Sequence, residues 1–241
     1  MEFYGMTDVG KMRHSNQDDW KAVSLIDGTA VLSVVCDGMG GANAGNVAST
    51  MASNEIKEYV MRSFRQNMTY TQIVNLLKSA IISANAAVYE ASCKDNELKG
   101  MGTTVVVALI MENVAYILHV GDSRAYIYDT QLKQITVDHS MVQNMVDSGE
   151  ITADEALHHP NKNIITRAIG VNENVGADLN VIDLNNGDVL LMCSDGLTNF
   201  VTDEQIENEL KNFSELTPQK LIALANDGGG GDNITAVVIR V

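Results

Sequence analysis

Short apolar runs and longer amphipathic stretches alternate along the chain, and their order predicts strands toward both ends with helices between them. Strands are expected at residues 2–8, 20–25, 31–37, 103–111, 114–120, 125–128, 177–184, 189–193 and 234–241. Apolar residues at helical spacing predict helices at 46–64, 73–88, 203–210 and 218–225. Because the regular strand–helix alternation of a parallel sheet is missing, the pattern predicts an α+β protein with mainly antiparallel sheets.

Two connections within this pattern carry specific predictions. The tight turn 121–124 follows one strand and precedes the next, which suggests that these two strands pair with each other. Residues 141–157 are helical but interrupted by Ser148-Gly149, so a small subdomain is expected outside the sheets at about 140–165. With only two prolines, no linker and no repeat, residues 1–241 are predicted to form a single domain.

The charge balance narrows the class of partner. The chain has 16 Lys and Arg against 31 Asp and Glu, a net charge of −15, which disfavours binding to nucleic acid or to an anionic membrane. The longest apolar run, 105–111, is too short to span a bilayer, and the acidic start MEFYGMTD does not resemble a signal peptide. Three cysteines without a C-x-x-C spacing fit buried thiols, so a cytoplasmic protein is predicted.

Four acidic residues occupy similar places at predicted strand ends. Asp37 ends the run VLSVVCDG, Asp195 ends VLLMCSDG, Asp122 follows AYILHV, and Asp232 precedes ITAVVIRV. In antiparallel neighbours the end of one strand lies beside the start of the next, so the four carboxylates can converge at one end of the sheets. The alternative is that each is simply a turn former, the common role of Asp before Gly or Asn.

A converging set of carboxylates needs cations, and Mg²⁺ or Mn²⁺ takes oxygen ligands of this kind while keeping several waters. The carbonyl of Gly38 could join them, since glycine presents its backbone readily. Two close ions can polarise a water and hold a phosphoryl group. Arg13, in the same polar turn as Asp18, could grip the phosphate with its planar guanidinium, although a surface ion pair is its alternative role.

Six motifs in the chain resemble, in order, those of the metal-dependent protein Ser/Thr phosphatases of the type 2C family. They are RHSNQDD (13–19), DGMGG (37–41), MGTT (101–104), GDSR (121–124), CSDGL (193–197) and GGDNIT (230–235). The stretch from DHSMVQNM to NIITRAIG is similar to the flap of the compact bacterial members, which oppose Hanks-type kinases.

The resemblance implies an α-β-β-α sandwich, two stacked antiparallel sheets flanked by helices, with two core Mg²⁺ or Mn²⁺ ions between the sheets and a third bound more weakly. It also implies a role for each site residue. Asp37 would bridge the two core ions, the Gly38 carbonyl would bind one of them, and Asp195 and Asp232 would bind the other. Asp122 and Asp195 would bind the third ion, Asp18 would lie behind the metal ligands, and Arg13 would bind the substrate phosphate.

Two positions depart from the family pattern. Ala42 stands where a His is common and Asn46 where a Glu is usual, so the proton donor to the leaving group stays open. We expect a monomeric phosphatase that hydrolyses phosphoserine and phosphothreonine in phosphoproteins by attack of a metal-bridging hydroxide and opposes a cognate Ser/Thr kinase. The alternatives are a phosphatase-like module that only binds phosphoproteins and a phosphoesterase for small molecules.

Overall fold

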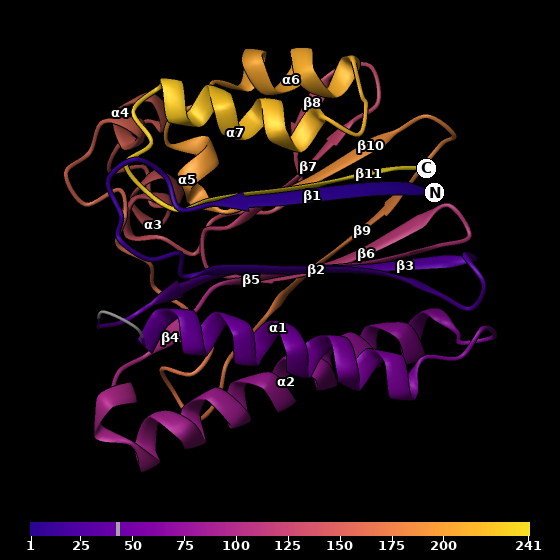
Figure 1. Cartoon of the computed structure of the whole chain (residues 1–241), viewed down its shortest axis with the longest axis horizontal. Helices are drawn as coiled ribbons and strands as arrows, with labels where there is room; N and C mark the ends of the chain where they lie inside the picture. The colour runs from indigo at the N-terminus through magenta and orange to yellow at the C-terminus, as the bar shows by residue number, and fades with distance from the viewer. Residues whose placement is uncertain (42–43) are drawn as a thin grey trace.

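A computed structural model describes residues 1–41 and 44–241, and it contains two antiparallel sheets stacked face to face (Figure 1). The five-stranded sheet has the spatial order β1 (Glu2–Asp8), β11 (Ile234–Arg240), β10 (Val189–Cys193), β7 (Arg124–Tyr128) and β8 (Leu132–Gln134). The six-stranded sheet has the order β2 (Asp18–Leu25), β3 (Ala30–Met39), β5 (Val105–Met111), β6 (Val114–Val120) and β9 (Asp178–Asp183), with β4 (Gly102–Thr103) paired to the end of β3.

The central strands read as continuous apolar runs because both of their faces are buried. In β5, Val105 and Val107 point to one side and pack among helix residues, whereas Val106 and Ala108 point to the other side and pack between the two sheets. Strand β10 divides its side chains in the same way between the inter-sheet core and a third core. The alternation of each strand therefore builds three apolar layers.

Helices cover the outer face of each sheet (Figure 1). Helices α1 (Ala44–Ser63) and α2 (Tyr70–Lys94) pack on the six-stranded sheet, and the short 3₁₀-helix η1 (Asn96–Leu98) follows α2. Helices α5 (Asp195–Thr198), α6 (Asp203–Lys211) and α7 (Thr217–Asp227) pack on the five-stranded sheet. The result is the predicted α-β-β-α sandwich.

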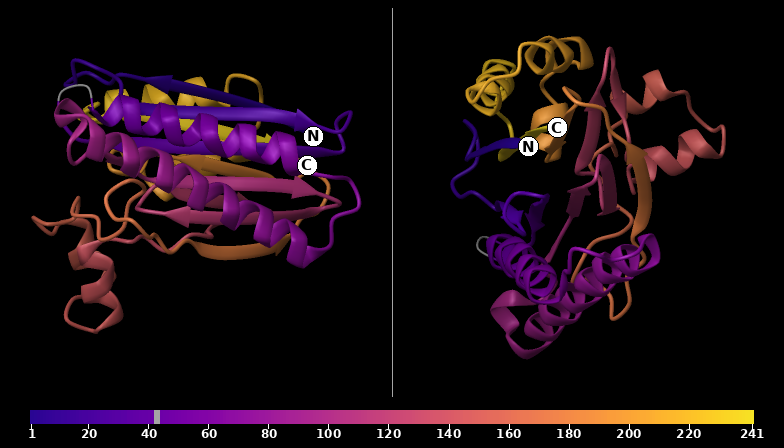
Figure 2. Two further views of the ribbon diagram at one scale, coloured as in Figure 1. Left: turned by 90° about the horizontal axis from the view of Figure 1, so that it is seen from below. Right: turned by 90° about the vertical axis from the view of Figure 1, so that its right-hand side faces the viewer.

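Two further helices, α3 (Met141–Asp147) and α4 (Ala153–Leu157), project from one side of the sandwich (Figure 2). We call residues 140–165 the flap segment. Its two ends meet where Ser140 and Ile165 pair as an isolated antiparallel bridge. The interruption at Ser148-Gly149 is real, since Gly149 adopts a φ of 75° after the end of α3.

Three details of the sequence prediction are corrected by the structure. Strands β6 and β7 do not pair, because the turn 121–124 carries the chain from the six-stranded sheet to the five-stranded one. Asp37 does not end its strand, since pairing with β4 continues β3 through Met39. Asp18 belongs to β2 and lies opposite Asp37, so it is not part of a loop.

The remaining sequence expectations concern single residues and a membrane span. Cys36 and Cys193 are buried as expected, whereas Cys93 is exposed. Within the described parts of the chain, no helix has the length and apolar character needed to cross a membrane. Ala42, the position that lacks the family's histidine, lies outside the described residues.

Candidate active site

Five carboxylates meet at one end of the sandwich, each brought there by a different element. Asp18 starts β2, Asp37 lies near the end of β3, Asp122 follows β6, Asp195 starts α5 and Asp232 precedes β11. The pKa of Asp37 is raised well above its usual range, first by burial and then by the charges of the four other aspartates. The four acids expected to converge therefore do so, and Asp18 joins them.

The close approach of the backbone in two motifs explains their glycines. A Cβ on Gly38 would lie 2.0 Å from the carbonyl oxygen of Gly45, at the start of α1. A Cβ on Gly196 would lie 1.9 Å from the carbonyl oxygen of Asn233, in the turn that carries Asp232. Neither position has room for a side chain, so both glycines allow motifs from distant parts of the sequence to come together.

Asp18 is buried beneath the cluster and half satisfied by hydrogen bonds. Its Oδ2 accepts from the hydroxyls of Ser194 and Thr235, both at 2.7 Å, whereas its Oδ1 is buried and has no partner among the described residues. Burial raises the pKa of Asp18 to about 7, partly offset by these two hydrogen bonds and reinforced by Asp195. Within the described chain, hydrogen bonds therefore hold only the Oδ2 oxygen of Asp18.

Asp195 repeats this arrangement. The side chain of Asn199, one helical turn away, donates to its Oδ2 at 2.9 Å, and its Oδ1 is buried and has no partner among the described residues. Burial and the charge of Asp232 raise the pKa of Asp195. A buried carboxylate oxygen without a donor is costly, and a cation removes that cost.

Asp122 lies at the edge of the cluster and is also buried. Burial, then the charges of Asp195 and Asp138, raise its pKa to about 8. Nearby, Arg124 forms a bidentate ion pair with Asp138, so this arginine is committed to another carboxylate. Arg124 therefore lowers the pKa of Asp122 only in part, and the net shift is upward.

Arg13 reaches the cluster, in agreement with its expected place. Its Nη2 donates to Oδ2 of Asp232 at 2.8 Å, and its side chain is 52% exposed to solvent. The surface ion pair that was its alternative role thus exists, but it is formed with a member of the cluster. An exposed guanidinium beside the carboxylates is suitably placed to meet an incoming anion.

Sequence reasoning missed the residues that hold these ligands in place. The amide of Asn233 donates to the carbonyls of Val9 and Ser15, and its Oδ1 accepts from the backbone of Gln17, so it binds the turn that carries Arg13. The sequence offered one indication of these residues, which is that Ser194, Asn233 and Thr235 each lie within three residues of a candidate acid. Asn46, at the other departure from the family pattern, is exposed and accepts from the Thr50 hydroxyl at 3.2 Å.

The carboxylates fit divalent ions that retain water. In residues 1–41 and 44–241, no three Asp, Glu, His or Cys side chains already form a closed ligand set around one point. Mg²⁺ does not require such a cage, because it binds through one or two carboxylates and several waters. Such an ion would satisfy the unpartnered oxygen of Asp195, and a water that the ion retains could donate to the unpartnered oxygen of Asp18.

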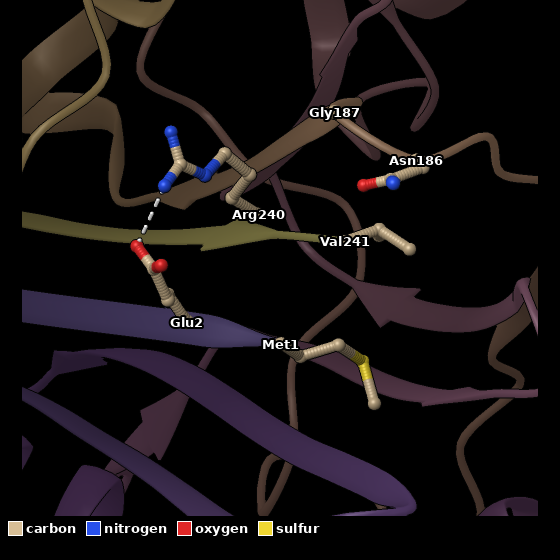
Figure 3. Close-up of a pocket in the computed structure, with 6 residues that line it drawn as sticks. All are labelled: Met1, Glu2, Asn186, Gly187, Arg240 and Val241. Atoms are coloured by element: carbon tan, nitrogen blue, oxygen red, sulfur yellow. Dashed lines mark hydrogen bonds and ion pairs between the residues drawn. The ribbon is translucent and has the colours of Figure 1, made fainter.

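An open cavity of about 440 Å³ lies elsewhere, beside the two chain termini (Figure 3). Its lining includes Glu2 and Arg240, which pair at the end of the β1–β11 ladder opposite to Asp8 and Ile234. The cavity is therefore separated from the acid cluster by the length of a strand.

Comparison with known proteins identifies the class to which this site belongs. The family model described as "Protein phosphatase 2C" matches residues 11–226. The serine/threonine phosphatase stp of Listeria monocytogenes is 38% identical over 237 residues, covering 97% of this chain and 93% of the relative. The chain therefore belongs to the protein phosphatase 2C family, and it is an enzyme of the protein-serine/threonine phosphatase class.

Solved structures support the same family at the level of the fold. The serine/threonine phosphatase Stp1 of Staphylococcus aureus superposes with a TM-score of 0.92 at 38% identity, covering 100% of this chain and 94% of that one. The catalytic domain of the serine/threonine protein phosphatase PstP, solved in complex with 2 manganese ions, has a TM-score of 0.85 at 34% identity, covering 98% and 96%. The expected resemblance is thus confirmed over nearly the whole chain.

Proposed function

We propose that this phosphatase hydrolyses phosphoserine and phosphothreonine in proteins with two Mg²⁺ or Mn²⁺ ions held by the acid cluster, without a covalent phosphoenzyme. The observation that carries the proposal is the convergence of five aspartates, two of which keep a buried oxygen with no partner in the described chain. A relative solved with manganese supports this choice of ions.

The ligand roles follow the family's motifs, and the charges around Asp37 support them. Asp37, whose pKa is raised by burial and by the charges of the four other aspartates, would be a ligand of both core ions. Gly38 would add its carbonyl to one ion, and Asp195 with Asp232 would bind the other. Asp122 would bind a third ion more weakly, together with Asp195. When bound, the ions supply a polarised water as the attacking nucleophile and neutralise phosphate charge.

The other residues orient the ligands and the substrate. Asp18 accepts from the hydroxyls of Ser194 and Thr235 on one oxygen, and its other oxygen is buried without a partner in the described chain. Arg13 would exchange its contact with Asp232 for the phosphate oxygens of the substrate, a bidentate contact that its guanidinium geometry favours. Ser194 is buried and donates to Asp18, so it is a support for the site and not a nucleophile.

We further propose that residues 1–241 act as one catalytic domain, that the flap segment contacts phosphoprotein substrates, and that the protein works as a cytoplasmic monomer opposite a Ser/Thr kinase. The projection of α3 and α4 from the sandwich supports a substrate-contacting role (Figure 2). A kinase that phosphorylates Ser and Thr is the class of enzyme that must supply these substrates.

The decisive experiment is hydrolysis of a phosphothreonine peptide with Mn²⁺, with EDTA and with no addition. The proposal expects activity with Mn²⁺ and none in EDTA. A protein that binds the phosphopeptide but never releases phosphate would instead be a phosphoprotein-binding module, and equal activity in EDTA would remove the metal from the mechanism.

A further inference from the structure

The turn that carries Asp122 is held by a buried histidine. His139 is 6% exposed, and its Nδ1 accepts the backbone N–H of Gly121 at 3.1 Å. The backbone N–H of His139 in turn donates to the carbonyl of Gly121 at 2.9 Å. Both the N–H and the carbonyl of Gly121 are therefore hydrogen-bonded to His139.

Gly121 needs this support because its conformation is unusual. Its φ is 105°, and a Cβ here would lie 2.6 Å from the Thr104 side chain. Thr104 closes one side of the turn, where its hydroxyl also bonds that of Ser123 at 2.7 Å. His139 closes the other side, so the direction of the Asp122 backbone depends on both contacts.

The contact with Gly121 also determines the tautomer of His139. A backbone N–H can only donate, so Nδ1 must be unprotonated, and in the neutral ring the proton lies on Nε2. Nε2 lies 3.3 Å from Oδ2 of Asp178, a carboxylate that can accept this proton. Burial, with the nearby His119 and Arg167, lowers the pKa of His139, which favours the neutral ring.

His139 also contacts the residues that directly follow the flap segment. Thr166 donates its backbone N–H to the carbonyl of His139 at 2.8 Å. Arg167 lies 3.2 Å from Nε2 of His139 and forms an ion pair with Asp178 at 2.8 Å. His119, three residues before Asp122, stacks on the ring with centroids 4.5 Å apart. His139 thus connects the Asp122 turn, β6, β9 and the chain that follows the flap segment.

We propose that His139 is a positioning residue for the phosphatase reaction: it fixes the Gly121–Asp122 turn through Nδ1 and ties that turn to Asp178 through Nε2. The inference rests on the proposed role of Asp122 as a ligand of the weaker metal. It assigns to His139 no contact with substrate or metal. Outer partners that orient metal ligands are typically worth about 10- to 100-fold in metal affinity or activity.

The test compares His139→Asn with His139→Gln. The amide oxygen of Asn can take the place of Nδ1 and accept from Gly121, whereas the longer Gln places its polar end near Nε2 and leaves the Gly121 amide without an acceptor. Both variants lose the ring stacked on His119, so a loss of packing affects them alike. We expect His139→Asn to keep most of the parental kcat/KM for p-nitrophenyl phosphate, and His139→Gln to lose about 10-fold.

The Mn²⁺ concentration for half-maximal activity should rise by about 10-fold in His139→Gln and stay near the parental value in His139→Asn. Glu2→Gln is the control, since Glu2 lies at the far end of the β1–β11 ladder and its side chain pairs only with Arg240 among the described residues. It should behave as the parent. If the Asn and Gln variants of His139 behave alike, whether both active or both impaired, the proposal is wrong.

A second measurement uses the unaltered protein and needs no turnover. In NMR spectra with Mg²⁺, His139 should show an unprotonated Nδ1 and a protonated Nε2 at neutral pH, and the Gly121 amide signal should shift as Mg²⁺ is added. A proton on Nδ1 of His139 would overturn the inference. So would a Gly121 amide signal that does not shift when Mg²⁺ is added. An inactive parent that still passes this test would count against the proposed function alone.

Discussion

The two ends of the β1–β11 ladder carry opposite arrangements of charge. At the end with the termini, Arg240 donates to Glu2 at 2.9 Å (Figure 3). Its guanidinium also lies 4.5 Å from the centre of the Phe213 ring. At the other end, five aspartates meet, and Arg13 pairs with one of them. Paired charges suit a surface that only has to be stable, whereas crowded carboxylates raise the free energy of the metal-free fold. The active site therefore lies at the end of the ladder where the crowded carboxylates lower the stability of the metal-free protein.

The largest expected effect is that of Asp37→Asn. Removing the carboxylate whose pKa is raised by all four other acids should lower kcat by about 10²- to 10³-fold or more, the loss seen when one preorganised electrostatic group is removed from an active site. The melting temperature in EDTA should be unchanged or higher, because one charge of a repelling group is gone. Activity and melting are measured on the same preparation.

Glu2→Gln is the matched control at the paired end, and it should leave kcat unchanged. An Asp37→Asn protein that is inactive because it is unfolded would not support a ligand role. One that retains full activity with Mn²⁺ would remove Asp37 from the site.

Arg13→Ala should have the next largest effect. If its guanidinium binds the substrate phosphate, KM for a phosphothreonine peptide should rise by about 10-fold, the effect of roughly 1.4 kcal/mol of lost binding, with a smaller change in kcat. Because this arginine is half exposed, the melting temperature should hardly change. Arg240→Ala breaks the corresponding ion pair at the other end and should leave KM as it is. Equal effects of the two substitutions on KM would contradict a specific role for Arg13.

Ser194→Ala should have a modest effect. The substitution removes a donor to Asp18 and the acceptor of the Thr235 N–H, so it should cost about 1–3 kcal/mol of unfolding free energy. If Ser194 supports Asp18 and is not the nucleophile, kcat should stay within about 10-fold of the parent. Urea denaturation and steady-state kinetics measure the two quantities. A loss of activity as large as that of Asp37→Asn would reopen a covalent route.

The smallest expected effect concerns pH without metal. The pKa values of Asp18 and Asp122 are raised to about 7 and about 8 in the folded protein, so between about pH 4 and pH 8 the folded state binds more protons than the unfolded chain. The free energy of unfolding in EDTA should therefore fall as pH rises through this window, and the melting temperature should be several degrees lower at pH 8 than at pH 5.5.

Saturating Mg²⁺ should restore the melting temperature at pH 8, and Asp37→Asn should weaken the pH dependence. Glu2→Gln, at the paired end, should alter neither. A melting temperature in EDTA that rises with pH over this range would show that the acid cluster does not determine the stability of the metal-free protein.

Much of the site could be predicted because its motifs are local. Each acid adjoins a glycine or a strand end within its own segment, so Asp37, Asp122, Asp195 and Asp232 were recognisable without the fold. The supports were harder to recognise, because Ser194, Thr235 and Asn233 act on residues far away in the sequence. The roles assigned to Arg13, Asp18 and the ligands stay predictions until the variants are measured.

The sequence by itself determined the strands with two buried faces, since alternate residues of β5 are apolar on both sides and must be covered on both. It also determined that the acids could meet at one end. Only the tertiary structure decided that β7 leaves β6 for the other sheet, because a turn of four residues is compatible with either pairing. It alone decided that one oxygen of Asp18 stays without a donor and that His139 accepts the Gly121 N–H, since both depend on groups more than a dozen residues apart.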